Sequence, residues 1–331
     1  MTRVAVLYNA PTLPTGHPDA ASEADVVAVA SVVLDALIGQ GFDAHLLPAS
    51  PPLASVLEAL AGSDVVFNLI EGFAGSSIGE AYLTGLLELL GLPYTGCPPS
   101  SQALCHSKAR TKALLRGFGL PTAPFAVARA GEPVPTWDGP WPAIVKPEAE
   151  DASLGIDQGS VVRGPVELAE ALIRLRSLHG GDALIESYLP GREFNVGVLA
   201  LPEPEALPVA EIAYDMPAGS WPILTYDAKW AVGSDADLAS PAVCPADIEP
   251  KLAARLASLA VEGFRATGCR DYARVDFRLD AKADPMILEV NPNPDLGPGA
   301  GWARALRASG RDHAGTLAAL ARRAFERGAR P

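Results

Sequence analysis

Two segments decide the fold: Tyr272-Ala-Arg-Val-Asp-Phe-Arg-Leu279 and, a few residues later, Met286-Ile-Leu-Glu-Val-Asn291. A short polar turn joins them, so we expect an antiparallel hairpin. Side chains alternate between the two faces of a strand. Arg274 and Asp276 therefore lie on one face of the first strand, and apolar residues lie on the other.

The second strand of this hairpin repeats the pattern, with Glu289 and Asn291 on one face. If the two polar faces coincide, two carboxylates, an amide and a guanidinium converge beside an apolar sheet. Carboxylates placed together repel unless a cation joins them. Mg²⁺ is typically held by one or two carboxylates together with substrate phosphates. We therefore predict that Asp276, Glu289 and Asn291 bind metal; the alternative is a polar face that is only solvated.

Composition limits the class of protein. The chain has 331 residues, 49% of them hydrophobic, which is enough for about two or three domains. A formal net charge of -13 without a Lys/Arg-rich block argues against a nucleic-acid partner. The four cysteines are far apart in the sequence and form no C-x-x-C motif, which disfavours a disulfide framework or a zinc site. The N-terminal apolar run is too short for a signal peptide, and no apolar stretch could span a bilayer, so we expect a cytoplasmic protein without a membrane partner.

The N-terminal third alternates strands with helices. Strands are predicted at Arg3–Tyr8, Asp43–Leu47 and Asp64–Leu69, with helices over residues 22–37 and 52–60. This order predicts a parallel sheet with helices on its faces. The turn after the first strand lacks G-x-G-x-x-G, which disfavours a nicotinamide enzyme.

A smaller unit is predicted in the middle of the chain, from a strand at Ala143–Pro147, a second at Ser160–Val162 and a helix at Val166–Leu178. Lys146 ends the first strand, before a loop that closes on a glycine, and Lys108 begins an earlier helix. A cation beside such a loop suits a phosphate clamp, although either lysine alone is more often a surface charge. Neither lies in a G-x-x-x-x-G-K-[ST] motif, so this is not a P-loop protein.

The sequence resembles the D-alanine–D-alanine ligase family of the ATP-grasp superfamily over nearly its whole length. The order and spacing of the matching segments carry the resemblance; they are residues 85–96, 107–112, 119–124, 144–147, 184–194, 226–230, 273–277 and 288–292. It implies an α/β (α+β ATP-grasp) fold of three domains. These are a Rossmann-like parallel-sheet domain (1–98), a small central α+β lid (99–182) and a C-terminal antiparallel-sheet catalytic domain (183–331).

The resemblance also implies the site. ATP would lie between the central and C-terminal domains, in contact with Lys108, Lys146, Ser153, Glu186, Ser187, Tyr188, Leu189 and Glu193. The hairpin residues would hold two Mg²⁺ ions, with Mn²⁺ as a substitute. Arg274 and backbone donors near Gly297 would stabilise an oxyanion, and Lys229, in a mobile loop beside Trp230, would reach the transferred phosphate.

The substrate residues depart from the family pattern. A Ser of the glycine-rich loop is Ala152, and the Tyr of a Lys-Tyr pair is Trp230. Glu71 stands in place of a His, Glu23 is the candidate partner of a substrate ammonium, and Ala300 and Gly301 occupy the place of a carboxylate-binding Ser. ATP chemistry is therefore expected to be retained and the substrates altered.

The resulting hypothesis is an ADP-forming carboxylate–amine ligase that makes a dipeptide or related amide through an acyl-phosphate. The alternatives are an ATP-grasp enzyme that passes an acyl or carboxy phosphate to a non-amine acceptor, and a non-catalytic nucleotide-binding protein. The expected partners are small-molecule substrates and a second copy in a homodimer.

Overall fold

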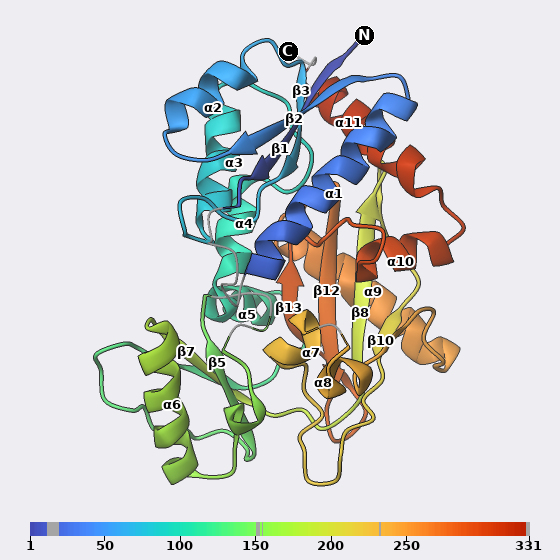
Figure 1. Cartoon of the computed structure of the whole chain (residues 1–331). Coiled ribbons are helices and arrows are strands. Elements are labelled where there is room, and N and C mark those ends of the chain that lie inside the picture. The colour runs from blue at the N-terminus through green and yellow to red at the C-terminus, as the bar shows by residue number, and fades with distance from the viewer. Residues whose placement is uncertain (12–19, 150–152, 154, 232, 329–331) are drawn as a thin grey trace.

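The computed structural model describes residues 1–11, 20–149, 153, 155–231 and 233–328, without the side chains of residues 20–24, 229 and 230. Its strands form three sheets. Figure 1 shows the N-terminal sheet at the top, the sheet of the central domain at the lower left, and the C-terminal sheet running between them. The predicted α/β fold, with a parallel N-terminal sheet and an antiparallel C-terminal sheet, is confirmed, and the sheet of the central domain is antiparallel as well.

The N-terminal sheet has the order β2-β1-β3, and both pairs of strands are parallel. Successive apolar residues of these strands point to opposite faces of the sheet. Both faces are therefore apolar, and helices cover each of them. Its strands are β1 (Arg3–Asn9), β2 (Asp43–Ala49) and β3 (Val65–Leu69), and its helices are α1 (Ala20–Gly39), α2 (Leu53–Leu60) and α3 (Gly79–Leu89).

Two short helices, α4 (Pro99–His106) and α5 (Lys108–Gly117), lead into the central domain. Its antiparallel sheet has the order β4-β7-β5-β6. The strands are β4 (Phe125–Ala128), β5 (Ala143–Pro147), β6 (Val161–Val162) and β7 (Ala183–Ser187). Val145 and Ile185 face the apolar side of α6 (Pro165–His179). Because strand side chains alternate, Lys146 and Glu186 point to the opposite face.

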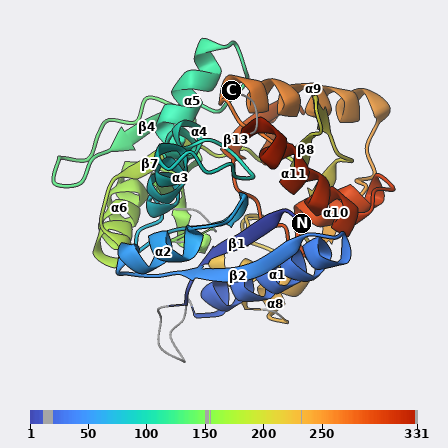
Figure 2. The same ribbon diagram turned by 90° about the horizontal axis from the view of Figure 1, so that it is seen from above.

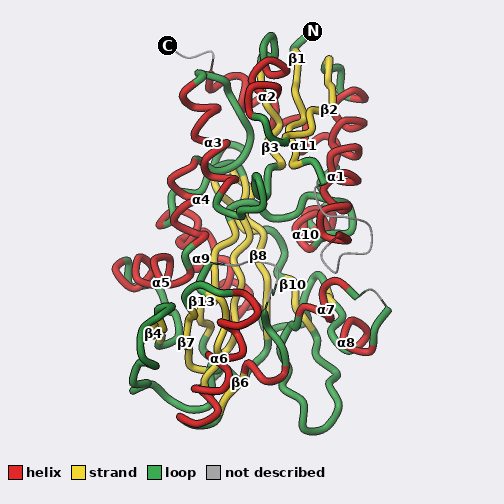
Figure 3. The backbone as a smooth tube through the Cα atoms, turned by 60° about the vertical axis from the view of Figure 1, so that its left-hand side comes forward, coloured by secondary structure: helices red, strands yellow, loops and turns green. Residues whose placement is uncertain are grey.

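The C-terminal sheet is antiparallel, in the order β11-β10-β8-β12-β13, and β9 pairs with β8. Helix α9 (Pro250–Ala266) packs its apolar side on one face of this sheet. The other face of the sheet, which is polar, is turned toward the other domains. Figure 3 shows these strands running along the middle of the molecule. The strands are β8 (Glu193–Ala200), β9 (Pro204–Ala206), β10 (Ala210–Ile212), β11 (Ala242–Val243), β12 (Tyr272–Leu279) and β13 (Pro285–Asn291).

The end of the chain returns to the N-terminal sheet. Helices α10 (Gly301–Ala308) and α11 (His313–Gly328) share one core with α1 and the first and third strands. Figure 2 shows α10 and α11 beside this sheet when the molecule is seen from above. Arg327 donates from Nη1 to Asp271 Oδ1 at 2.7 Å and from Nη2 to Tyr94 O at 2.8 Å. The last helix thus ties the N-terminal and C-terminal domains together.

The structure differs from the sequence-based expectations in local detail. Ser160 ends a 3-10 turn instead of starting a strand. The loop expected around Lys229 contains the short helices α7 (Tyr226–Trp230) and α8 (Asp235–Leu238), capped by Thr225 and Ser234. Among the described helices, none is both long and apolar enough to cross a bilayer.

Candidate active site

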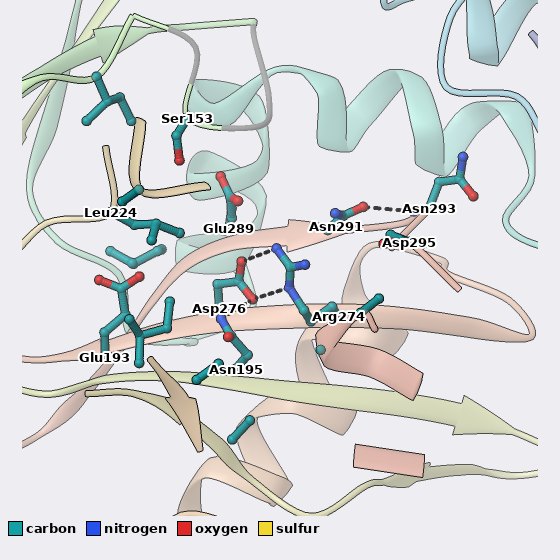
Figure 4. A pocket seen from close by; sticks show the side chains of 18 of the residues that line it. Ser153, Glu193, Asn195, Leu224, Arg274, Asp276, Glu289, Asn291, Asn293 and Asp295 are labelled. Carbon is teal, nitrogen blue, oxygen red and sulfur yellow. Dashed lines mark hydrogen bonds and ion pairs between the residues drawn. The ribbon is translucent and has the colours of Figure 1, made fainter. Parts of the chain in front are cut away.

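A cavity of about 1020 Å³ opens where the three domains meet, and residues of all three line it. Its volume is at the upper end of the range for small-molecule sites, large enough for a nucleotide and further substrates. Figure 4 shows Glu193 at one end, the hairpin residues in the middle and Asp295 at the other end. We call the end at Glu193 the nucleotide end and the end at Asp295 the substrate end. Sixteen of the sequence-predicted site residues line the cavity: Glu71, Lys108, Lys146, Ser153, Glu186, Ser187, Tyr188, Leu189, Glu193, Arg274, Asp276, Glu289, Asn291, Gly297, Ala300 and Gly301.

The predicted coincidence of polar faces on the hairpin is confirmed by its register. Arg274 lies opposite Asn291, and Asp276 lies opposite Glu289. A bulge follows Asp276 and shifts the pairing of the residues beyond it. The apolar residues of both strands point to α9. Two carboxylates, an amide and a guanidinium therefore share one wall of the cavity.

A neighbouring strand adds an amide to this wall. Asn195 of β8 pairs with Asp276 in the sheet and donates from Nδ2 to its Oδ1 at 2.9 Å. Arg274 donates from Nε and Nη2 to the two oxygens of the same carboxylate, each at 2.7 Å. Sequence reasoning missed Asn195, although the alternation of Glu193 and Asn195 with apolar residues is the same signal that identified the hairpin.

The hairpin residues suit a hard cation. Asp276, Glu289 and Asn291 offer oxygen ligands, which Mg²⁺ prefers. The described residues contain no group of three or more His, Cys, Asp and Glu side chains placed to hold a metal. Two carboxylates and an amide do not fill the coordination shell of Mg²⁺, so such an ion would need phosphate oxygens or water as further ligands. The donor set fits a metal that arrives with a nucleotide.

Glu186 is the centre of an ion-pair cluster on the opposite wall. Its Oε1 lies 2.5 Å from Lys112 Nζ and its Oε2 lies 2.8 Å from Lys146 Nζ. The side chains of Glu186 and Lys112 are 1% and 0% exposed. Lys108 and Lys146 are also buried, at 5% and 7% exposed, so neither is an ordinary surface charge. Sequence reasoning named Lys108 and Lys146 but missed Lys112.

Burial and charge act against each other in this cluster. Burial alone would raise the pKa of Glu186, but Lys112 and Lys146 outweigh it and hold that pKa below its usual value. Burial lowers the pKa of Lys112 to about 8, against the opposing pull of Glu186. Two lysines therefore face one carboxylate in this cluster. The surplus positive charge lies toward the cavity, where an anion would be stabilised.

Glu193, one of the predicted ATP contacts, is oriented by two partners at the nucleotide end. Tyr214 Oη donates to its Oε2 at 2.9 Å, and Arg278 Nη1 donates to the same oxygen at 3.2 Å. Arg278 also donates to Gly191 O at 3.1 Å and to Tyr188 Oη at 3.2 Å. Burial raises the pKa of Glu193, and the Arg278 charge opposes this. Sequence reasoning missed Arg278 and Tyr214.

The substrate end is formed by α1, the segment after β13 and the start of α10. Gly297 N donates to Asp295 Oδ1 at 2.6 Å, so this predicted backbone donor already has a partner. A Cβ at Gly297 would lie 3.0 Å from Val29 Cγ2, which explains the glycine. Trp302 does not line the cavity but is buried, and it donates from Nε1 to Val198 O at 3.3 Å.

Three predicted residues cannot be placed by their side chains. Lys229 and Trp230 lie in α7, and Glu23 lies in α1, but their side chains fall outside the described part of the chain. Ala152 lies outside it altogether. Asp25, two residues after Glu23, and Ala228, just before Lys229, line the cavity.

Comparison with known proteins gives related sequences over most of the chain. An uncharacterized protein of Sinorhizobium fredii, y4sG, is 35% identical over 296 residues, which is 87% of this chain and 85% of the relative. A D-alanine–D-alanine ligase of Bordetella petrii is 37% identical over 268 residues, 80% of this chain and 76% of the relative.

The fold comparison gives the same relationship. The crystal structure of a D-alanine–D-alanine ligase from Bacillus anthracis complexed with ATP superposes with a TM-score of 0.75 at 18% identity and covers 99% of this chain and 98% of that chain. The family described as "D-ala D-ala ligase C-terminus" matches residues 114–321. This match and the relatives show that the chain belongs to the D-alanine–D-alanine ligase family.

Proposed function

We propose that this protein is an ADP-forming carboxylate–amine ligase that joins two small molecules through an acyl-phosphate. The observation that carries the proposal is the pair of opposed charged walls: Lys146 with Glu186 on one side, and Asp276 opposite Glu289 on the other. The related ligases and the family match support the same reaction class.

ATP is proposed to bind in this cavity in one orientation. Ser187, Tyr188 and Leu189 would border the adenine, and Glu193 would accept hydrogen bonds from the ribose hydroxyls. The phosphates would then lie between Lys108 and Lys146 and the hairpin carboxylates. Bound Mg²⁺, held by Asp276, Glu289 and Asn291, would neutralise charge on the phosphate oxygens.

The protein's own residues account for the remaining steps. A carboxylate is a poor electrophile, and positioned cations assist its attack on the terminal phosphorus of ATP. The incoming amine then attacks the acyl carbon, negative charge develops on the acyl oxygen, and the C–O bond to phosphate breaks, so that inorganic phosphate leaves and the amine loses a proton. Arg274 is the guanidinium placed to stabilise this charge, because Asp276 fixes its orientation. The cavity lies between the three domains, which would limit access of water to the acyl-phosphate.

The substrates are proposed to differ from two D-alanines. Glu71, Ala300 and Gly301 line the substrate end, where the resemblance would have placed a His and a carboxylate-binding Ser. Two amino acids, or an amino acid and a small acid, fit the carboxylate-plus-amine chemistry.

A phosphate-release screen tests this function. Mg-ATP is incubated with the protein and pairs of amino acids and small acids, and products are identified by mass. We expect ADP together with a product whose mass is the sum of two substrates minus water. Substrate-dependent ADP without such a product would favour a non-amine acceptor. No substrate-dependent ADP from any pair would favour the non-catalytic alternative.

A further inference from the structure

Three of the four cysteines, far apart in the sequence, meet where the domains join. Cys97 follows the N-terminal sheet, Cys105 lies in the last turn of α4, and Cys269 lies between α9 and β12. Cys97 Sγ accepts from Arg270 N at 3.3 Å and donates to Arg270 O at 3.4 Å. It is therefore held against the residue next to Cys269.

Cys105 is held on the other side of the same turn. Ser101, one helical turn before Cys105 in α4, donates from Oγ to Gly268 O at 2.7 Å. Cys105 and Cys269 belong to one apolar cluster. Thr267 Oγ1 lies 3.3 Å from Cys269 Sγ. The turn at 267–270 thus places the Cys269 sulfur beside the Thr267 hydroxyl and near the thiols of Cys97 and Cys105.

The surroundings of the three sulfurs differ. Hydrogen bonds from Cys105 and Cys97 hold the pKa of Cys269 well below its ordinary value, whereas burial raises the pKa of Cys97. Cys269 is partly exposed, and Cys97 and Cys105 are buried. A partly exposed cysteine with two neighbouring thiols can be oxidised and then resolved as a disulfide.

We propose that Cys269 is a redox-active thiol that a peroxide oxidises and that Cys97 or Cys105 resolves into an intramolecular disulfide. The thiolate attacks one peroxide oxygen, the O–O bond breaks, hydroxide leaves and a sulfenic acid forms. The neighbouring thiol then attacks the Cys269 sulfur, the S–O bond breaks and water leaves as the S–S bond forms. The disulfide would link the turn that leads into β12 to the segment between the N-terminal and central domains.

Cys244 is a matched internal control. It is also partly exposed, but burial raises its pKa, and its Sγ donates only a long hydrogen bond of 3.7 Å to Pro208 O. It stands outside the cysteine cluster. A general oxidation would affect Cys244 as much as Cys269, and a site-specific one would spare it.

The full chain is treated with hydrogen peroxide, remaining thiols are alkylated, and peptides are mapped without reduction. Trypsin places Cys269 in the short peptide 266–270, Cys244 in 230–251, and Cys97 and Cys105 together in 4–108. We expect peptide 266–270 to become joined to 4–108 while Cys244 is still alkylated. Before oxidation, Cys269 should react with iodoacetamide about tenfold faster than Cys244, because its thiolate fraction is larger.

Variants identify the resolving residue. Only one of Cys97→Ser and Cys105→Ser should abolish the cross-link, and in the double variant the sulfenic acid on Cys269 should be trapped by dimedone. Cys244→Ser should behave as the native chain does. The proposal is overturned if native Cys244 reacts as fast as Cys269, or if peroxide forms a disulfide that lacks Cys269. These measurements on the native chain do not depend on the proposed ligase activity or on how any variant folds.

Discussion

The two walls of the cavity carry opposite surplus charge. On the central-domain wall, Lys112 and Lys146 face the single carboxylate of Glu186. On the hairpin wall, Arg274 faces Asp276, and Glu289 lies opposite Asp276 in the sheet. Summed over these residues, Lys112, Lys146 and Glu186 carry one net positive charge, and Arg274, Asp276 and Glu289 carry one net negative charge. A polyanion fits the first wall directly, whereas it fits the second only through a cation.

The largest expected effect comes from the hairpin wall. Glu289→Gln keeps the shape and removes the excess negative charge, so we expect turnover to fall at least about a hundredfold through weaker metal binding. Because a like-charge neighbour of Asp276 is lost, thermal stability without nucleotide should hold or rise. Steady-state ADP formation over a range of Mg²⁺ and differential scanning calorimetry measure both.

Glu262→Gln, the same change on an exposed side chain of α9, is the control for this variant and should have no effect. Turnover of Glu289→Gln within a factor of about two of the native rate at limiting Mg²⁺ would remove the metal assignment.

On the central-domain wall, the next largest effect is expected on the free energy of unfolding. Lys112→Met leaves the buried Glu186 with one partner, and breaking a buried ion pair in this way costs about 3–5 kcal/mol. Chemical denaturation measures the free energy of unfolding. Lys112→Met with Glu186→Leu should recover much of the loss, since no uncompensated charge then remains buried. A loss below about 1 kcal/mol in the single variant would show that Lys146 alone compensates Glu186.

The substrate end belongs to neither charged wall and is expected to decide specificity. With D-alanine as sole substrate we expect turnover roughly a hundredfold below the best pair, since the hydrogen-bond donors that would bind it are replaced. The assay is ADP formation with millimolar D-alanine beside the best pair from the screen. Efficient formation of D-alanyl-D-alanine would show that other groups supply these donors.

The smallest effect on catalysis is expected at the nucleotide end, at Arg278, which pairs with Glu193. We expect Arg278→Met to reduce the preference for ATP over 2′-deoxy-ATP by about tenfold, since Glu193 loses a charged partner that orients it. KM and kcat for both nucleotides are measured. Arg192→Met, which removes an exposed arginine paired with Glu211, should leave the preference unchanged. An unchanged preference in Arg278→Met would show that Tyr214 orients Glu193 without help.

Local patterns in the sequence predicted the hairpin correctly because alternation and one turn determine which of its side chains share a face. The pairs between distant segments were missed. Lys112 and Glu186 are 74 residues apart, and Asn195 and Asp276 are 81 apart, so only the tertiary fold brings them together. The same holds for the cysteine cluster and for α11 on the N-terminal sheet. The sequence separation of the cysteines gave no information on this proximity.

The most direct test of the ligase proposal follows one oxygen atom. The carboxylate substrate from the screen is labelled with ¹⁸O in both carboxyl oxygens, and the released phosphate is analysed by mass. Activation as an acyl-phosphate predicts one ¹⁸O in each phosphate released, with ADP as the nucleotide product. Unlabelled phosphate, or AMP with pyrophosphate, would contradict it.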